Sequence, residues 1–146
     1  MQRHREWLIE DLQGLPQDRA AIRQLTSEIE TLALEFKAIK ATNYDKIPTG
    51  GNGNSQQEKI ENNIAKREEL KWCLEYTRHH VSDMERLLSS LSEKDRTIIE
   101  KTYITGHCTT EEIAEEIGLS WRQVLNRKRD AVDKLLHLRF GQGYRP

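Results

Sequence analysis

Apolar residues recur three and four positions apart over two long stretches of the chain. Residues 17–41 carry the first series, which consists of Ile22, Leu25, Ile29, Leu32, Phe36 and Ile39. The second series begins near residue 55 with Ile60 and Ile64, shifts phase at Arg67, and continues as Leu70, Leu74, Thr77, Val81, Met84, Leu88 and Leu91. This is the spacing of a heptad seam, so we predict two long helices that pair as an antiparallel, coiled-coil-like hairpin.

A short amphipathic helix is predicted ahead of this hairpin, over residues 1–15. Its apolar face consists of Trp7, Leu8, Leu12 and Leu15. Gly14 and Pro16 follow the pattern of a helix end, since glycine and proline both disfavour helix continuation.

The segment 42–54, TNYDKIPTGGNGN, is predicted to be the loop of the hairpin because Pro48 and three glycines cannot continue a helix. Neither Lys-Ser nor Lys-Thr follows the glycines and no strand precedes them, so a connector is favoured over a phosphate-binding loop. Ser55 with Glu58 forms a predicted capping box and indicates the start of the second long helix, which should end near Ser90.

Residues 109–138, TTEEIAEEIGLSWRQVLNRKRDAVDKLLHL, show the pattern of two helices joined by a tight turn. The first helix begins with threonines that can cap it, and Gly118 stands where a left-handed residue ends it. Ser120 is expected to cap a second helix over residues 121–139, with a buried stripe of Val124, Ala131, Leu135 and Leu138. Because Ala114 lets the helices cross closely, this pattern predicts a helix-turn-helix, which places its second helix in the DNA major groove.

A further helix is predicted in front of this motif, from the Ser92–Asp95 capping box to about Tyr103. Its Ile98 and Ile99, together with Tyr103, are expected to close the core of the motif.

The positive charge of the chain is concentrated at its C-terminal end. The whole chain has a net charge of −1, whereas residues 121–146 carry seven Lys or Arg and two Asp. Arg122, Asn126 and Arg129 share one face of the predicted helix, away from its apolar stripe. A solvated basic surface is the alternative, but its position after the tight turn favours DNA binding.

The stretch LSEKDRTIIEKTYITGHCTTEEIAEEIGLSWRQVLNRKRDAVDKLL resembles region 4 of bacterial sigma factors. The layout of a helical N-terminal half, a glycine-rich loop and this module also resembles phage late-gene activators of the RinA and ArpU type. No counterpart of the sigma domain that melts promoters is present. The resemblance implies a phage or prophage late-gene activator that binds double-stranded DNA and contacts RNA polymerase.

The same resemblance, together with the geometry of a helix in the major groove, predicts the DNA contacts. The residues expected to contact base edges are Ser120, Trp121, Arg122 and Asn126. Those expected to contact phosphates are Thr109, Thr110, Gln123, Arg127, Lys128 and Arg129. Trp121 departs from the sigma pattern, so we expect a different target sequence.

Composition excludes several other classes of protein. The chain has 36% hydrophobic and 32% charged residues, a balance typical of narrow helical seams. Cys73 and Cys108 stand far apart without a secretory signal, and no apolar run has the length of a membrane span. We expect a protein of the bacterial host cytoplasm, without a membrane segment, cofactor, metal site or enzymatic activity.

The predicted protein is therefore all-α with three parts. Residues 1–90 form a helical hairpin domain, residues 91–140 form a helix-turn-helix domain, and residues 141–146 form a flexible tail. The two seams predict a homodimer. A small-terminase-like DNA-packaging protein and a coiled-coil adaptor that binds only proteins are the alternative functions, which stoichiometry and salt-sensitive DNA binding would distinguish.

Overall fold

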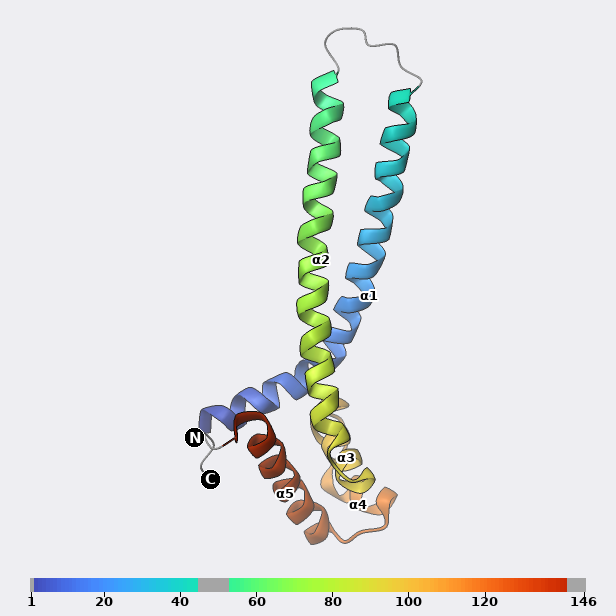
Figure 1. The fold of residues 1–146 in the computed structure, drawn as a ribbon. Coiled ribbons are helices and arrows are strands. Elements are labelled where there is room, and N and C mark those ends of the chain that lie inside the picture. Colours follow the sequence, from blue (N-terminus) through green and yellow to red (C-terminus); the bar gives the residue numbers. More distant parts are fainter. Residues whose placement is uncertain (1, 45–52, 142–146) are drawn as a thin grey trace. The chain divides into compact units, whose positions relative to one another are not determined.

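The computed structural model describes residues 2–44 and 53–141, and every regular element among them is helical (Figure 1). Two long helices come first, and a group of short elements and one longer helix follow. Their bounds are α1 Gln2–Tyr44, α2 Gly53–Ser89, α3 Glu93–Ile99, the π-helical turn η1 Glu100–Ile104, α4 Thr110–Ile117 and α5 Trp121–Phe140. The predicted all-α class is confirmed.

The chain divides into two compact units, and the division cuts both long helices. One unit consists of Met1–Asp18 with His80–Pro146, and the other is Arg19–His79. The start of α1 and the end of α2 thus belong to the same unit as α3, α4 and α5. The units do not follow the boundary predicted at residue 90.

The predicted break near Pro16 is wrong, because α1 is continuous and contains Pro16 in its interior. Proline removes one backbone hydrogen bond and strains the preceding turn of a helix. Burial on the N-terminal side offsets that cost, since Leu8, Leu12 and Leu15 are completely excluded from solvent. Gly14 likewise has no positive φ and continues the helix.

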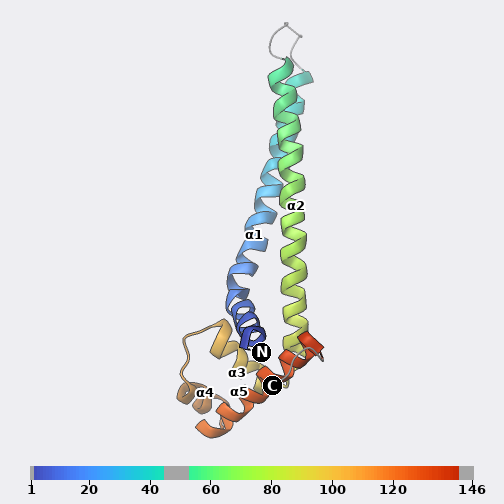
Figure 2. The same ribbon diagram turned by 90° about the vertical axis from the view of Figure 1, so that its left-hand side faces the viewer.

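The unit Arg19–His79 is an antiparallel pair made by the later part of α1 and most of α2. The two helices lie side by side in both views (Figures 1 and 2). The predicted seam of α1 is only partly covered by α2. Its residues are all half-buried, namely Ile22, Leu25, Ile29, Leu32, Phe36 and Ile39. Leu74 of α2 is buried. One pair of helices is too narrow to exclude water from a whole heptad seam.

The upstream part of the α2 seam differs from the prediction. Ile64 is exposed, and Asn63 occupies the buried position instead. The Asn63 side-chain amide donates a hydrogen bond to the Leu32 carbonyl at 2.9 Å, which satisfies its donor inside the interface. Nearby, the Arg67 guanidinium lies 4.6 Å from the Phe36 ring centre. Polar and cation–π contacts therefore replace aliphatic packing here.

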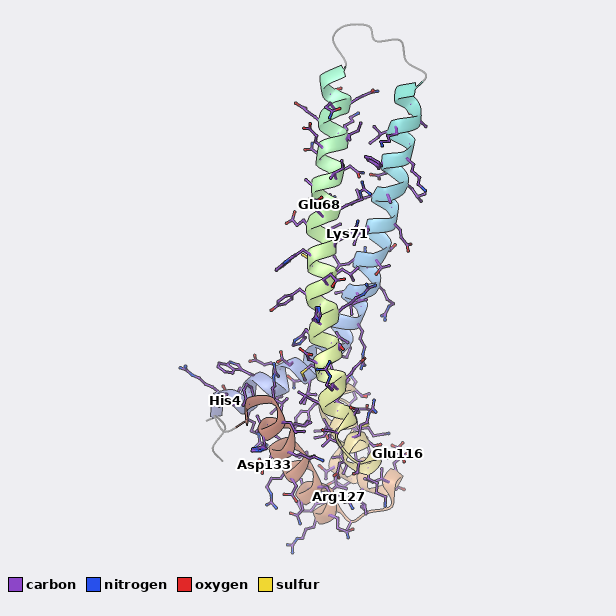
Figure 3. The ribbon with its side chains drawn as sticks, in the orientation of Figure 1. His4, Glu68, Lys71, Glu116, Arg127 and Asp133 are labelled. Atoms are coloured by element: carbon purple, nitrogen blue, oxygen red, sulfur yellow. The ribbon has the colours of Figure 1, made fainter. Side chains whose placement is uncertain are left out.

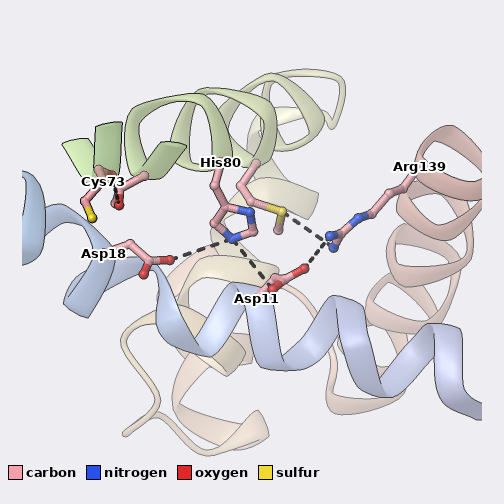
Figure 4. Close-up of polar contacts among 7 residues, drawn as sticks. Asp11, Asp18, Cys73, His80 and Arg139 are labelled. Atoms are coloured by element: carbon pink, nitrogen blue, oxygen red, sulfur yellow. Dashed lines mark hydrogen bonds and ion pairs between the residues drawn. The ribbon is translucent and has the colours of Figure 1, made fainter. Parts of the chain in front are cut away.

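Half-buried polar side chains connect three helices of the other unit. His80 of α2 lies with its Nε2 3.6 Å from Asp11 and 3.7 Å from Asp18, both on α1 (Figure 4). Asp11 is also paired with Arg139 of α5, whose Nη1 lies 3.7 Å from the Met84 sulfur. Asp11 is thus shared between α2 and α5, and it connects the end of α5 to the start of α1.

An aromatic contact strengthens the same connection between α1 and α5. The His4 ring centre lies 4.5 Å from that of Phe140 and 5.5 Å from that of Trp7. The C-terminal end of α5 is therefore held by residues that stand more than a hundred positions earlier in the chain.

Both predicted non-helical segments fall largely outside the described residues. Residues 45–52 of the predicted loop are not described, but α1 extends to Tyr44 and α2 begins at Gly53, two residues before the predicted cap at Ser55. Of the predicted tail, only Gly141 is described. It ends α5 with a positive φ of 58°, and its N–H donates to the His137 carbonyl.

The completely buried face at the start of α1 predicts a measurable effect on stability. Leu12→Ala should lower the free energy of unfolding by about 2–5 kcal/mol, since it removes buried methyl groups and leaves a cavity. Leu34→Ala is the control, because that side chain is 67% exposed and should change stability by less than about 0.5 kcal/mol. Urea unfolding followed by circular dichroism measures both. Equal stability of the two variants would contradict the assigned packing of α1.

Candidate nucleic-acid interface

The helices of the C-terminal module begin at capping residues that the sequence marks. The Ser92 hydroxyl accepts a hydrogen bond from the Asp95 backbone N–H at 3.3 Å and so caps α3. A reciprocal capping box was predicted here, but the Asp95 carboxylate pairs instead with Arg127 of α5 at 3.1 Å. That ion pair connects α3 to α5 within the module.

The helix predicted to run to Tyr103 changes its geometry after Ile99. Residues Glu100–Ile104 form the π-helical turn η1, and the Thr105 N–H donates to the Glu100 carbonyl at 2.8 Å. Lys101 of this turn is paired with Glu116 of α4, and the carboxylate raises the pKa of the Lys101 ammonium above its usual value. The ammonium therefore stays charged at neutral pH, and the attraction between the two groups is lost as the pH rises through the raised pKa.

The tight turn of the motif has the predicted geometry. Thr109 and Glu112 form a reciprocal capping box at the start of α4. Gly118 ends α4 with φ 71° and ψ 33°, in the left-handed region that favours glycine. The Gly118 and Leu119 N–H groups both donate to the Ala114 carbonyl, which closes the turn.

Helix α5 begins directly after this turn and is capped in the same way. The Ser120 hydroxyl accepts from the Gln123 N–H at 3.2 Å, and the Gln123 side-chain oxygen accepts from the Ser120 N–H at 2.9 Å. This reciprocal box fixes the orientation of the first turn of α5.

A small apolar core fixes how α3, α4 and α5 cross. Ile98, Ile113, Ala114 and Val124 form a buried cluster, and Cys108, Ile117 and Leu119 pack against it. Ile99 is also fully buried, whereas the predicted core residue Tyr103 is only half-buried. Further along α5, the buried residues are Ala131, Val132, Leu135 and Leu136. Leu138, predicted to belong to this stripe, is 49% exposed because α5 turns a different face to its neighbours at that point.

The predicted base-contacting residues are grouped at the exposed start of α5. Ser120, Trp121, Arg122 and Asn126 are all exposed. With 3.6 residues per turn, Arg122 and Asn126 each lie about 160° around the helix from Val124. Trp121 is 51% exposed. The structure brings these four residues together, and their contacts with DNA remain a prediction.

The residues predicted to contact phosphates differ from one another in exposure. Arg129 is exposed, with its Nε 3.5 Å from Asp130, whereas Arg127 and Lys128 are half-buried. The Arg127 guanidinium is also committed to Asp95, which makes it a structural group as well as a candidate contact.

The capping boxes of α4 and α5 already use polar groups that were predicted to bind phosphates. The Thr109 N–H donates to the Glu112 carboxylate at 3.3 Å, and the Gln123 side-chain oxygen is part of its own capping box. Glu111 and Glu112 fill the first turn of α4 with negative charge. A phosphate at Thr109 or Thr110 would have to displace or neighbour these carboxylates, so this part of the predicted contact set is the weakest.

Three short helical elements, a left-handed turn and a capped basic helix define a helix-turn-helix DNA-binding module. Residues 87–137 match the family model described as Sigma-70, region 4. The C-terminal module is thus sigma-region-4-like, and the match covers the end of α2 and the elements from α3 through most of α5. Comparisons with curated proteins and with solved structures gave no match.

The described part of the chain lacks two other features. No group of three histidine, cysteine or carboxylate side chains within residues 2–44 and 53–141 is placed to hold a metal ion. None of the helices described here combines the length and apolar character needed to cross a bilayer.

The turn geometry gives a matched pair of glycine substitutions. Gly118→Ala should destabilise the protein by about 1–2 kcal/mol, because a side chain disfavours positive φ although the surrounding space is open. Gly14→Ala should instead stabilise it by about 0.5–1 kcal/mol, since Gly14 is helical and the added carbon would lie 3.8 Å from its nearest neighbour, Asp18. Thermal unfolding compares the two variants. A stabilising Gly118→Ala would contradict the left-handed turn.

Proposed function

We propose that the protein binds a specific double-stranded DNA sequence through the start of α5 and regulates transcription from nearby promoters. The observation that carries this proposal is the exposed pair Arg122 and Asn126 on a capped helix whose opposite side is anchored by buried Val124, with exposed Trp121 in the same first turn. A helix held in this way can enter the major groove without losing its packing.

The side chains at this surface have the chemistry for base recognition. Arg122 can donate two hydrogen bonds to guanine, and the Asn126 amide can bond adenine through one donor and one acceptor. Trp121 offers apolar contact to a thymine methyl group or to the sugar edge. Because Arg122 and Asn126 are one helical turn apart, they would contact neighbouring base pairs.

Basic residues beside this group supply sequence-independent affinity. Arg129 lies further along the exposed face, and Lys128 lies at its side. Asp130 and Asp133 are exposed on α5 beyond them, so negative charge limits the DNA-facing surface to the first turns of the helix.

The finer proposal is a late-gene activator of a phage or prophage that works with bacterial RNA polymerase in the host cytoplasm. Its support is the sigma-region-4-like module together with the long N-terminal helices, a layout similar to the RinA and ArpU type of regulator. The half-buried α1 seam further supports a homodimer in which a second copy covers the remaining apolar edge.

Substitutions in α5 test the assigned roles in DNA binding. On a duplex isolated by selection from a genomic library, Arg122→Ala should weaken binding by about 1–3 kcal/mol and relax preference at one base pair. Arg129→Ala should weaken binding to all sequences alike and make the salt dependence shallower by about one unit. Titrations on selected and scrambled duplexes at several salt concentrations measure both effects.

Lys37→Ala provides the control for this series, because Lys37 is an exposed cation on α1 in the other unit. It should leave DNA binding unchanged. Identical, sequence-independent losses for Arg122→Ala and Arg129→Ala would show that α5 is only an electrostatic anchor.

Regulation is tested separately by transcription in vitro with purified bacterial RNA polymerase. Templates that carry a selected site beside a promoter should give more transcript when the wild-type protein is present, and Arg122→Ala should remove most of this gain. Templates with a scrambled site are the control. Unchanged transcription in spite of specific DNA binding would contradict the activator role while leaving the DNA-binding proposal intact.

A further inference from the structure

Two large aromatic side chains are exposed on α2, on the side that turns away from α1. Trp72 and Tyr76 are each 68% exposed, and their rings stack with centres 5.6 Å apart and planes inclined by 19°. With 3.6 residues per turn, Trp72 lies about 180° from buried Asn63 and about 160° from buried Leu74. The pair is therefore directed away from the hairpin seam.

Carboxylates predominate on the side of α2 that carries this aromatic pair, where exposed His79 lies with its Nε2 4.0 Å from Glu75. Five glutamates of residues 55–79 lie within about 60° of Trp72 on the helix, whereas every Lys and Arg of this stretch lies further away. The glutamates are Glu58, Glu61, Glu68, Glu69 and Glu75, and all are exposed. Figure 3 labels Glu68 and Lys71 on α2. We name Trp72, Tyr76 and these glutamates the aromatic–acidic face.

We propose that the aromatic–acidic face is a docking surface for a protein partner that presents arginine side chains. A guanidinium group can lie flat on the indole or phenol ring and pair with a flanking carboxylate at the same time. Trp and Tyr are also enriched among the residues that dominate protein interfaces.

The negative charge of the aromatic–acidic face argues against two other partners, namely DNA and a second copy of the same face. DNA carries dense negative charge, so it is repelled by five glutamates. A second copy of the same face would place glutamates against glutamates, and like charges across an interface cost several kcal/mol. The face is thus separate in chemistry from the DNA-binding start of α5, and the two surfaces belong to different units.

A synthetic helical peptide that carries an arginine at every fourth position among alanines is the probe for this proposal. The full-length protein is titrated with the peptide, and the indole N–H signal of Trp72 is followed by NMR. We expect this signal to shift while that of Trp7 stays unchanged. A double substitution Trp72→Ala with Tyr76→Ala should weaken peptide binding about tenfold and leave DNA binding unchanged.

Two controls separate the aromatic–acidic face from general attraction between charges. Leu34→Ala removes a side chain of similar exposure, 67%, from α1 and should not alter peptide binding. Replacing Glu68, Glu69 and Glu75 by Gln should weaken binding about tenfold. The same replacement at the exposed α1 residues Glu28, Glu30 and Glu35 changes the net charge equally and should have little effect.

Three results would overturn the proposal. The first is no peptide binding by the wild-type protein, and the second is an equal loss of affinity in the two glutamate variants. The third is that the wild-type protein sediments as a dimer whereas the Trp72→Ala, Tyr76→Ala double variant sediments as a monomer. This result would show that the face binds a second copy of the chain.

Discussion

The burial of one side of α5 is the interaction on which the rest of the C-terminal unit depends. Val124 at its start and Leu135 and Leu136 near its end are almost completely excluded from water. Contacts to the core cluster fix the first turn, and contacts of Arg139 and Phe140 with α1 fix the last. A helix held at both ends keeps its remaining face in one orientation, which a sequence-specific DNA contact needs.

This anchoring divides the charged residues of α5 into two groups. Arg127 and Arg139 form ion pairs with Asp95 and Asp11 and serve the fold. Arg122 and Arg129 lie on the exposed side, where a partner can reach them. Positive charge on a helix is therefore an incomplete guide to function, because half-buried arginines stabilise the crossing of helices. The N-terminal residues of α1 participate in the same anchoring, so the DNA-binding unit includes a segment that lies outside the sigma-region-4-like stretch.

The helix-turn-helix could be predicted from the sequence because its signals are local. Thr109, Gly118 and Ser120 each determine a cap or a turn within a few residues, and the structure confirms all three. The sequence predicted a helix end near Pro16, whereas α1 continues past it. This continuation depends on buried leucines whose neighbours come from distant segments. The pairing of Asp95 with Arg127 was missed for the same reason: a local capping pattern does not show that a carboxylate has a competing partner 32 residues away. The residues that contact DNA are determined by the DNA as well as by the protein. Neither the periodicity of the sequence nor the packing of the helices can therefore identify them.

We propose that the first turns of α5 form the DNA-contacting surface. The most direct test is an NMR titration of the full-length protein, with assigned backbone amides, against a duplex obtained by site selection. We expect the largest and saturable shifts on residues 120–129, with little change on residues 19–40 and 55–79. Largest shifts on the long helices of Arg19–His79, with α5 unaffected, would contradict it.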